Sequence, residues 1–404
     1  MKRSFGMIVA IGAFANVANA QSSVTLYGLI DESFEAVSNV KTAPGEGKAL
    51  YQLDATSGLQ GSRWGLRGAE DLGAGLKAIF VLENGFEINT GKLNQGGAEF
   101  GRQAFVGLSS TGYGSITLGR QYDTLVDLVS PFGAAEQWAS HRGSHPGDLD
   151  NLNNSVRTNN SIKYSSASYG GLIFDGLYSL GGQPGSISRN QVFSLAAAYT
   201  NGPVAFGVGY LNVRNPNNSF FGDNPSGGGV TVNNMSPSTN PVFSGYASAH
   251  TYQVIATGGS YAFGAATVGA TYSNIKFMNL GDTATSGPNP LGYAGTATFN
   301  NAEVSGKYQM TPALVFGVAY DYTRGSDVSS TLATVHDAGA RYHQFALGAD
   351  YSLSTRTDVY ILGVYQKATG VDSTGQVAVA SITSVTAAAG NHAALVRLGM
   401  RVKF

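Results

Sequence analysis

VRLGMRVKF, residues Val396–Phe404, ends the chain and shows the pattern that decides its fold. Apolar and polar side chains alternate along this stretch with a period of two, which is the period of a β-strand. One face carries Val396, Leu398, Met400, Val402 and Phe404. The opposite face carries Arg397, Arg401 and Lys403. We therefore expect a terminal strand with one apolar face and one cationic face.

The same alternation recurs in segments of about ten residues along the chain. Around residue 305 the apolar face is Ala302, Val304, Gly306 and Tyr308, and the polar face is Glu303, Ser305, Lys307 and Gln309. The next segment places Leu314, Phe316, Val318, Tyr320 and Tyr322 on a single face. A soluble barrel buries such a face, whereas a membrane barrel presents it to lipid and keeps a polar lumen.

The composition favours the membrane alternative. Charged residues make up 12% of the chain, about half the share that is typical of soluble proteins. The mean hydropathy of -0.03 is too low for a helical membrane protein, and the 55 Gly and 21 Tyr suit short strands and tight turns. A formal net charge of -1 offers no basic surface, so we expect no nucleic-acid partner.

The N-terminus has the form of a secretory signal peptide. Lys2 and Arg3 precede a short apolar run at residues 7–15, and Ala18-Asn19-Ala20 has the small-x-small cleavage pattern. We therefore expect residues 1–20 to be a signal peptide and residues 21–404 to be a single barrel domain. No other stretch is apolar for the ~20 residues of a spanning helix, so a membrane form must be a closed barrel.

The connections between the expected strands alternate in length. Short ones fall near residues 70–75, 110–114, 167–171, 201–202, 263–264, 311–312 and 354–356. Long ones fall near residues 39–59, 89–99, 123–157, 181–190, 214–249, 278–298, 324–340 and 369–391. Seven short turns and eight long loops join sixteen strands. We predict an all-β fold, a sixteen-stranded antiparallel transmembrane barrel with short periplasmic turns and long external loops.

Several stretches resemble the trimeric general porins of Gram-negative bacteria, β-proteobacterial type. They are SVTLYG (Ser23–Gly28), SRWGLRGAEDLGAGLKAIFVLENGF (Ser62–Phe86), GRQAFVGL (Gly101–Leu108), GSITLGRQYD (Gly114–Asp123), SVRTNNSIKYSS (Ser155–Ser166) and the terminal VRLGMRVKF. The terminal Phe404 is similar to the sorting signal of outer-membrane barrels. The resemblance implies an outer-membrane homotrimer whose third loop folds into the barrel and faces a cluster of arginines. That loop often contains Pro-Glu-Phe-Gly in the family, whereas Ser130-Pro131-Phe132-Gly133 lacks the acid after the proline.

Five arginines are candidates for the basic wall of a pore. Strand parity places Arg63, Arg67 and Arg157 on polar, lumenal faces. Arg102 matches a lumenal arginine of the family, although both faces of its strand are apolar. Arg120 has the parity of the lipid face, so it reaches the lumen only if the strand ends or bulges there. The alternative for each is a cation at the rim or at an interface.

Three acids on the 123–157 loop are candidates for the opposite side of the constriction: Asp123, Asp127 and Glu136. A cationic wall that faces an anionic loop sets up a field across a narrow aqueous gap, and charge rings and pore width are the usual sources of channel selectivity. The alternative is that these acids are solvated loop charges. On the same loop His141, Ser144, His145 and Asp148 match no catalytic or metal-binding spacing, so we expect no catalytic residue, no metal and no cofactor.

The predicted function is passive diffusion of ions and small hydrophilic solutes through a water-filled channel, with weak anion preference. Alternatives are a substrate-specific channel, an outer-membrane enzyme and a closed structural barrel. The expected partners are outer-membrane lipid, the solutes, and two further copies of the chain. The copies would meet through strands near both termini, where Val24, Leu26, Gly28 and Ile30 form a small apolar face.

Overall fold

The computed structural model describes residues 22–43, 45–236, 239–335 and 339–404. The predicted signal peptide lies outside these residues. The strands are β1 (Ser23–Lys41), β2 (Gly47–Asp54), β3 (Arg63–Gly73), β4 (Leu76–Gly85), β5 (Gln103–Ser110), β6 (Gly114–Gln121), β7 (Thr158–Ser165), β8 (Leu172–Ser179), β9 (Val192–Asn201), β10 (Val204–Arg214), β11 (Ala249–Phe263), β12 (Ala266–Leu280), β13 (Gly295–Thr311), β14 (Leu314–Gly325), β15 (Arg341–Ser352), β16 (Thr357–Thr369) and β17 (His392–Lys403). Two short helices, α1 (Thr124–Leu128) and α2 (Pro216–Ser219), lie in the loops. No helix of the described residues has the length and apolar character needed to cross a membrane.

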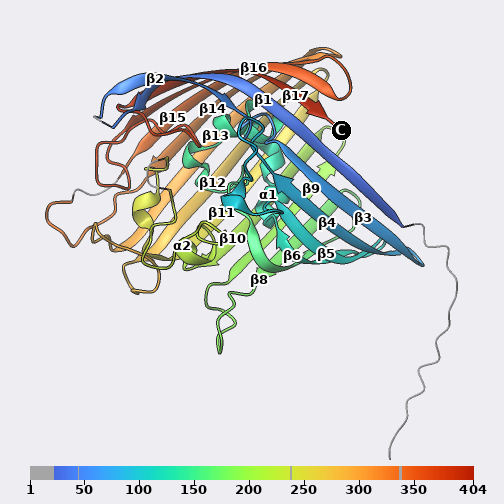
Figure 1. Cartoon of the computed structure of the whole chain (residues 1–404), viewed down its shortest axis with the longest axis horizontal. Coiled ribbons are helices and arrows are strands. Elements are labelled where there is room, and N and C mark those ends of the chain that lie inside the picture. Colours follow the sequence, from blue (N-terminus) through green and yellow to red (C-terminus); the bar gives the residue numbers. More distant parts are fainter. Residues whose placement is uncertain (1–21, 44, 237–238, 336–338) are drawn as a thin grey trace, which may run out of the picture.

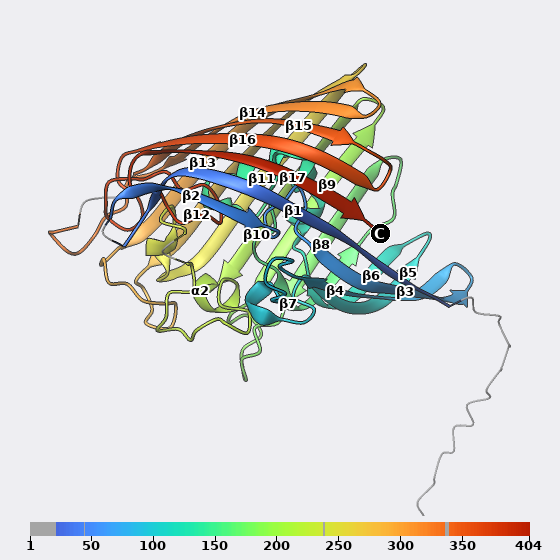
Figure 2. The ribbon, with the colours of Figure 1, turned by 45° about the horizontal axis from the view of Figure 1, so that its top comes forward.

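The strands form one closed antiparallel sheet (Figures 1 and 2). Closure is made by β1 and β17, which are paired from Leu29 opposite Lys403 to Val37 opposite Leu395. The other edge of β1 pairs with two strands in succession, β2 along its second half and β3 along its first half. Because β2 and β3 share one position, the seventeen strands occupy sixteen positions around the wall. The predicted sixteen-stranded barrel is therefore confirmed.

The first predicted loop, residues 39–59, needs correction. Residues 47–54 of that range form β2, which pairs with β1 and extends the wall, and only residues 42–46 connect the two strands. The chain then leaves the sheet at residues 55–62 before it returns as β3. The Gly and Ser residues of this stretch suggested one long loop, but the alternating segment before them is long enough for a paired strand.

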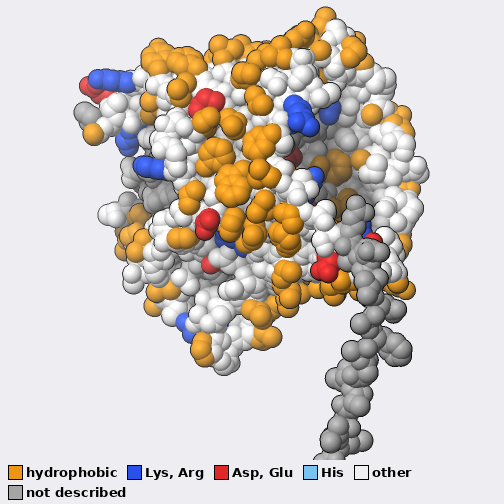
Figure 3. Space-filling view, turned by 45° about the vertical axis from the view of Figure 1, so that its right-hand side comes forward, with side chains coloured by type: hydrophobic (Ala, Val, Ile, Leu, Met, Phe, Trp, Pro, Cys, Tyr) orange, Lys and Arg blue, Asp and Glu red, His pale blue; other side chains and the backbone are white. Residues whose placement is uncertain are grey.

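The outer wall is apolar and the inner wall is polar, as the alternation predicted. On β17 the side chains of Val396 and Leu398 are 48% and 55% exposed, whereas Arg397 between them is fully buried inside the barrel. Figure 3 shows hydrophobic side chains gathered over the outer surface with few charged groups among them. An apolar surface of this kind is suited to contact with lipid.

The segment between β6 and β7, residues 122–157, folds into the lumen. Its helix α1 contacts the inner faces of β8, β9 and β10, as the interior ribbon of Figure 1 shows. Further along, Phe132 lies against Gly207 and Gly258, and Trp138 lies against Gly317. A Cβ atom at Gly317 would lie 2.1 Å from the Trp138 ring, so these glycines make room for the loop. The loop therefore occupies the side of the lumen next to β8, β9 and β10.

Candidate functional site

A polar cavity of about 510 Å³ lies between the inward loop and the wall around β3. Its lining includes three of the candidate arginines and two of the candidate acids: Arg63, Arg102, Arg157, Asp127 and Glu136. The structure therefore brings together residues that stand up to 94 positions apart in the sequence, from Arg63 to Arg157. This cavity is the candidate constriction.

Arg63 and Arg102 differ in how far their charge is compensated. The Arg63 guanidinium forms no hydrogen bond or ion pair with any side chain among the described residues. Arg102 donates from Nε to Glu83 Oε1 at 2.7 Å and from Nη2 to the Tyr122 hydroxyl at 2.9 Å. Arg63 therefore has no direct ion pair, although the charges of Glu83 and Glu136 act on it from a distance, whereas Glu83 offsets part of the charge of Arg102 through a direct contact.

Arg157 is the most enclosed of the wall arginines. Its side chain is 6% exposed and its Nη1 donates to the backbone oxygen of Ser155 at 3.2 Å. The guanidinium lies 5.8 Å from the centroid of the Tyr122 ring, within cation–π range. The Nε atom of Arg157 has no hydrogen-bond partner among the described residues. Arg157 also lines a second cavity of about 520 Å³ on the loop side, so it stands where the two cavities meet.

Arg120 reaches the lumen through a bulge. The register of β6 against β7 shifts between Gly119 and Gln121, and Gly119 has a φ of +143°. Arg120 Nε donates to the backbone oxygen of Gly101 at 2.8 Å, and Nη1 donates to Asn159 Oδ1. Its side chain lines the second cavity, of about 520 Å³, and not the candidate constriction. A bulge, the condition that strand parity required, is therefore present.

Arg67 and Asp123, like Arg120, are not among the residues that line the candidate constriction. Arg67 stands four residues further along β3 than Arg63, is exposed, and stacks over the Tyr27 ring at 5.3 Å. Asp123 is 0% exposed and caps α1, where its Oδ1 accepts from the backbone nitrogen of Leu125 at 2.9 Å. Burial raises the pKa of Asp123 to about 6. Asp123 therefore caps α1 inside the loop and is not among the residues that line this cavity.

The acidic side of the constriction is weak. Asp127 forms an ion pair with Lys163, a lumenal residue of β7, so most of its charge is offset. Glu136 is exposed to the cavity, has no ion pair within 4 Å among the described residues, and feels the charges of Arg63 and Arg102. Among the described charged residues that line the cavity, Arg102 is paired with Glu83 and Asp127 with Lys163, which leaves Arg63, Arg157 and Glu136 without an ion pair.

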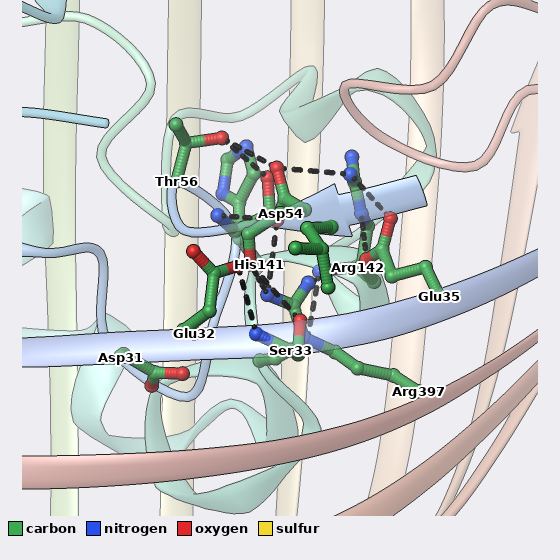
Figure 4. Close-up of polar contacts among 12 residues, drawn as sticks. Asp31, Glu32, Ser33, Glu35, Asp54, Thr56, His141, Arg142 and Arg397 are labelled. Atoms are coloured by element: carbon green, nitrogen blue, oxygen red, sulfur yellow. Dashed lines mark hydrogen bonds and ion pairs between the residues drawn. The ribbon is translucent and has the colours of Figure 1, made fainter. Parts of the chain in front are cut away.

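A buried network fixes the tip of the inward loop to the wall. Arg142 donates from Nε and Nη2 to the two carboxylate oxygens of Glu35, both at 2.9 Å, and from Nη1 to the backbone oxygen of Thr383 at 2.9 Å. Arg397 lies 2.5 Å from Glu35 Oε1 and 2.9 Å from Asp54 Oδ2. Figure 4 shows both guanidinium groups converging on the two carboxylates. Bidentate, charge-assisted contacts of this kind set both distance and orientation, so the loop position is defined by β1, β2 and β17.

Comparison with known proteins decides the family. A family model described as Gram-negative porin matches residues 7–370. The chain belongs to the Gram-negative porin family. It is an outer-membrane channel for passive diffusion, and the family's function is transport, not enzymatic catalysis. An outer membrane porin protein of Bordetella pertussis is 29% identical over 395 residues, which cover 91% of this chain and 94% of that protein.

Other porins match as well. Outer membrane porin protein 32 of Delftia acidovorans is 36% identical over 226 residues, which cover 52% of this chain and 59% of that protein. Among solved structures, an anion-selective porin from Comamonas acidovorans superposes with a TM-score of 0.67 at 25% identity. That match covers 95% of this chain and all of the Comamonas chain. An outer membrane protein of Vibrio cholerae shares the fold at a TM-score of 0.63.

Sequence reasoning missed several residues of this porin's interior. Glu35 lies on the inner face of β1, and its alternation with apolar neighbours could have placed it there. Arg142 gave no such signal because it is in a loop, and Glu83 gave none because both faces of β4 carry apolar residues. Lys163 has the strand parity of Arg157, but its pairing with Asp127 depends on the course of the loop.

Proposed function

We propose that this porin is weakly anion-selective and that the cavity beside β3 is its constriction. The observation that carries the proposal is the charge of that cavity: Arg63 and Arg157 have no ion pair among the described residues, Arg102 is paired with Glu83, and Glu136 is the one acid of the lining without an ion pair. Salt screens exposed charges over roughly 8–10 Å. A solute inside a narrow gap is closer than that to the wall, so the local arginines outweigh the slightly acidic chain as a whole. The Comamonas relative, which is described as anion-selective, supports the same sign.

The test removes the two arginines least compensated by acids. Replacing both Arg63 and Arg157 with Gln should move the zero-current potential in a salt gradient towards the cation-selective sign. Arg189→Gln, on an exposed external loop, is the matched control and should leave the potential unchanged. A strongly cation-selective wild-type pore, or an unchanged potential in the double variant, would contradict the proposal.

We infer that the working unit is a homotrimer that assembles through the outer walls of the terminal strands. On β1 the side chains of Val24 and Leu26 are 65% and 60% exposed. Nearby, an apolar groove of about 500 Å³ runs over β1 and β15–β17, and Glu32 lies at its edge opposite Met400. A carboxylate on the lipid face is unfavourable, whereas a second copy could offer it polar contacts. Native mass spectrometry in detergent should show trimers, and a monomer alone would exclude this assembly.

We also propose that residues 1–20 are removed on export. The charged start, short apolar run and cleavage pattern support this. N-terminal sequencing of the protein from outer membranes should begin at Gln21. A mature chain that still begins at Met1 would contradict it.

A further inference from the structure

A second segment besides the inward loop enters the lumen. Residues 55–62 leave the wall between β2 and β3, and Thr56–Gly61 all line the candidate constriction. They carry no charge. The cavity therefore has three sides of different chemistry: the arginine wall, the loop with its acids, and this neutral polar segment.

Asp31 holds one end of the segment in place. This β1 residue is 0% exposed, and its Oδ2 accepts from the backbone nitrogen of Gln60 at 3.2 Å. Its backbone nitrogen and oxygen both bond the Ser62 hydroxyl at 3.0 Å. The Tyr360 hydroxyl donates to Asp31 Oδ1 at 2.6 Å and fixes the carboxylate from β16. The two bonds to Ser62 also give partners to backbone groups of β1 between Leu29 and Ser33, where β1 pairs with neither β2 nor β3.

Asp54 holds the other end. Its Oδ1 accepts from the Thr56 hydroxyl at 2.8 Å and its Oδ2 accepts from the backbone nitrogen of Ser57 at 2.9 Å. The same carboxylate pairs with Arg397, so the segment shares its anchor with the tip of the inward loop (Figure 4). The backbone oxygen of Gly58 also accepts from the backbone nitrogen of His141 at 3.5 Å. The two inward elements therefore touch and are fixed by one network.

Gly58 shows how closely the segment is packed. A Cβ atom there would lie 2.2–2.3 Å from the carboxylate atoms of Asp31. No side chain fits at that distance unless the segment or the Asp31 side chain shifts. The φ of Gly58 is one that any residue can adopt, so glycine is required here by the close approach to Asp31 and not by the backbone conformation.

We propose that residues 55–62 are a second constriction element and that Gln60 is a specificity-determining residue of the pore. Gln60 lines the cavity three positions before Arg63, and its side-chain amide forms no hydrogen bond with any described residue. A free amide both donates and accepts hydrogen bonds. A small anion next to Arg63 that carries a hydroxyl or amide group can therefore replace a hydrogen bond to water with a hydrogen bond to Gln60. The substrate class is small anions with an adjacent hydrogen-bonding group, an assignment that rests on the proposed anion preference.

The experiment uses the full-length porin in planar bilayers. Gln60→Glu should shift the zero-current potential towards the cation-selective sign, with about a twofold change in the permeability ratio. Gln60→Ala should lower the permeability of glycolate relative to acetate, which lacks the hydroxyl. Gln376→Glu, on an exposed loop, is the charge control. Gly58→Ala should change single-channel conductance, whereas Gly112→Ala, which has open space around it, should not.

The outcomes separate this inference from the proposed function. If the wild-type pore prefers anions but Gln60→Glu and Gln60→Ala both behave as wild type, the inference is overturned and the proposed function stands. If the wild type shows no anion preference yet Gln60→Glu shifts its potential, the anion proposal fails and the second constriction element is supported. A wild-type conductance in Gly58→Ala would overturn the close packing of the segment against Asp31.

Discussion

Two sets of arginines lie inside this barrel and differ in what surrounds them. Arg142 and Arg397 are 1% and 0% exposed, and each is held by carboxylates at hydrogen-bond distance. Arg63 faces a water-accessible cavity with no partner, and Arg157 keeps an unpaired Nε beside the same cavity. From this difference we expect an arginine to act on a passing ion only where the protein leaves its charge uncompensated. In the proposed function, Arg142 and Arg397 position the constriction, and Arg63 and Arg157 supply its field.

The largest effect is expected from a change at Glu35, whose carboxylate contacts both Arg142 and Arg397. Glu35→Gln leaves Arg142 and Arg397 buried with too little negative charge, a change that costs about 3–5 kcal/mol when a buried pair loses one partner. We expect a lower thermal unfolding temperature and noisy, larger conductance, because the tip of the inward loop is released. Unfolding of the detergent-solubilised porin, followed by its heat-dependent gel mobility, measures the first effect.

Glu46→Gln is the control for Glu35. Glu46 pairs with Lys48 at 3.2 Å, but its side chain is 65% exposed, and exposed pairs contribute roughly 0–1 kcal/mol. The two variants remove the same charge from β1–β2. Equal unfolding temperatures for both would show that the buried network does not hold the loop.

Alternation in the sequence was sufficient for the wall but not for the passage. It predicted which face of β17 meets lipid and the lumenal side of Arg63 and Arg157, because a strand has only two faces. It left Arg120 open, because a bulge at Gly119 changes the parity. It gave no guidance on Asp123, a candidate only because it lies on the 123–157 loop, since loop acids follow no period and burial depends on the packed course of the chain.

The segment 55–62 lay beyond sequence reasoning for a related reason. Its residues have the composition of an external loop, and nothing in their order shows that they turn inward. Their direction is set by Asp31 and Asp54, whose neighbours in space come from β16, β17 and the inward loop. The inward direction of residues 55–62 is therefore set by contacts between elements far apart in the chain, which a local sequence pattern does not reveal.

A further test concerns Asp148, a buried acid that has no arginine partner among the described residues. Asp148, in the inward loop, is 5% exposed, and its oxygens accept from the backbone nitrogens of Asn153 at 2.9 Å and Ser155 at 3.0 Å. Burial, together with the charge of Asp150, raises the pKa of Asp148 to about 7. Its neutral form therefore stabilises the fold below the unfolded-state pKa of about 4, and that contribution is lost as pH rises to about 7.

The measurement compares Asp148→Asn with the wild type between pH 4 and pH 8. The Asn variant keeps a neutral side chain at every pH, so its stability relative to wild type should rise by up to about 1.4 kcal/mol per pH unit and level off above pH 7. Asp282→Asn, at an exposed position, should show no such trend. Urea unfolding midpoints at each pH give the values, and a constant difference between Asp148→Asn and wild type would refute the role of burial.

The smallest effect is expected at Arg102, which stands between the two sets. It lines the constriction, yet Glu83 accepts from its Nε at 2.7 Å. Glu83→Gln keeps the shape and leaves the charge of Arg102 uncompensated beside the cavity, so anion preference should rise, by about twofold in the permeability ratio. Glu99→Gln, at an exposed loop position, should leave the zero-current potential unchanged. If Glu83→Gln also leaves it unchanged, compensation by a neighbouring carboxylate does not decide which arginines act on ions, and the distinction between the two sets fails.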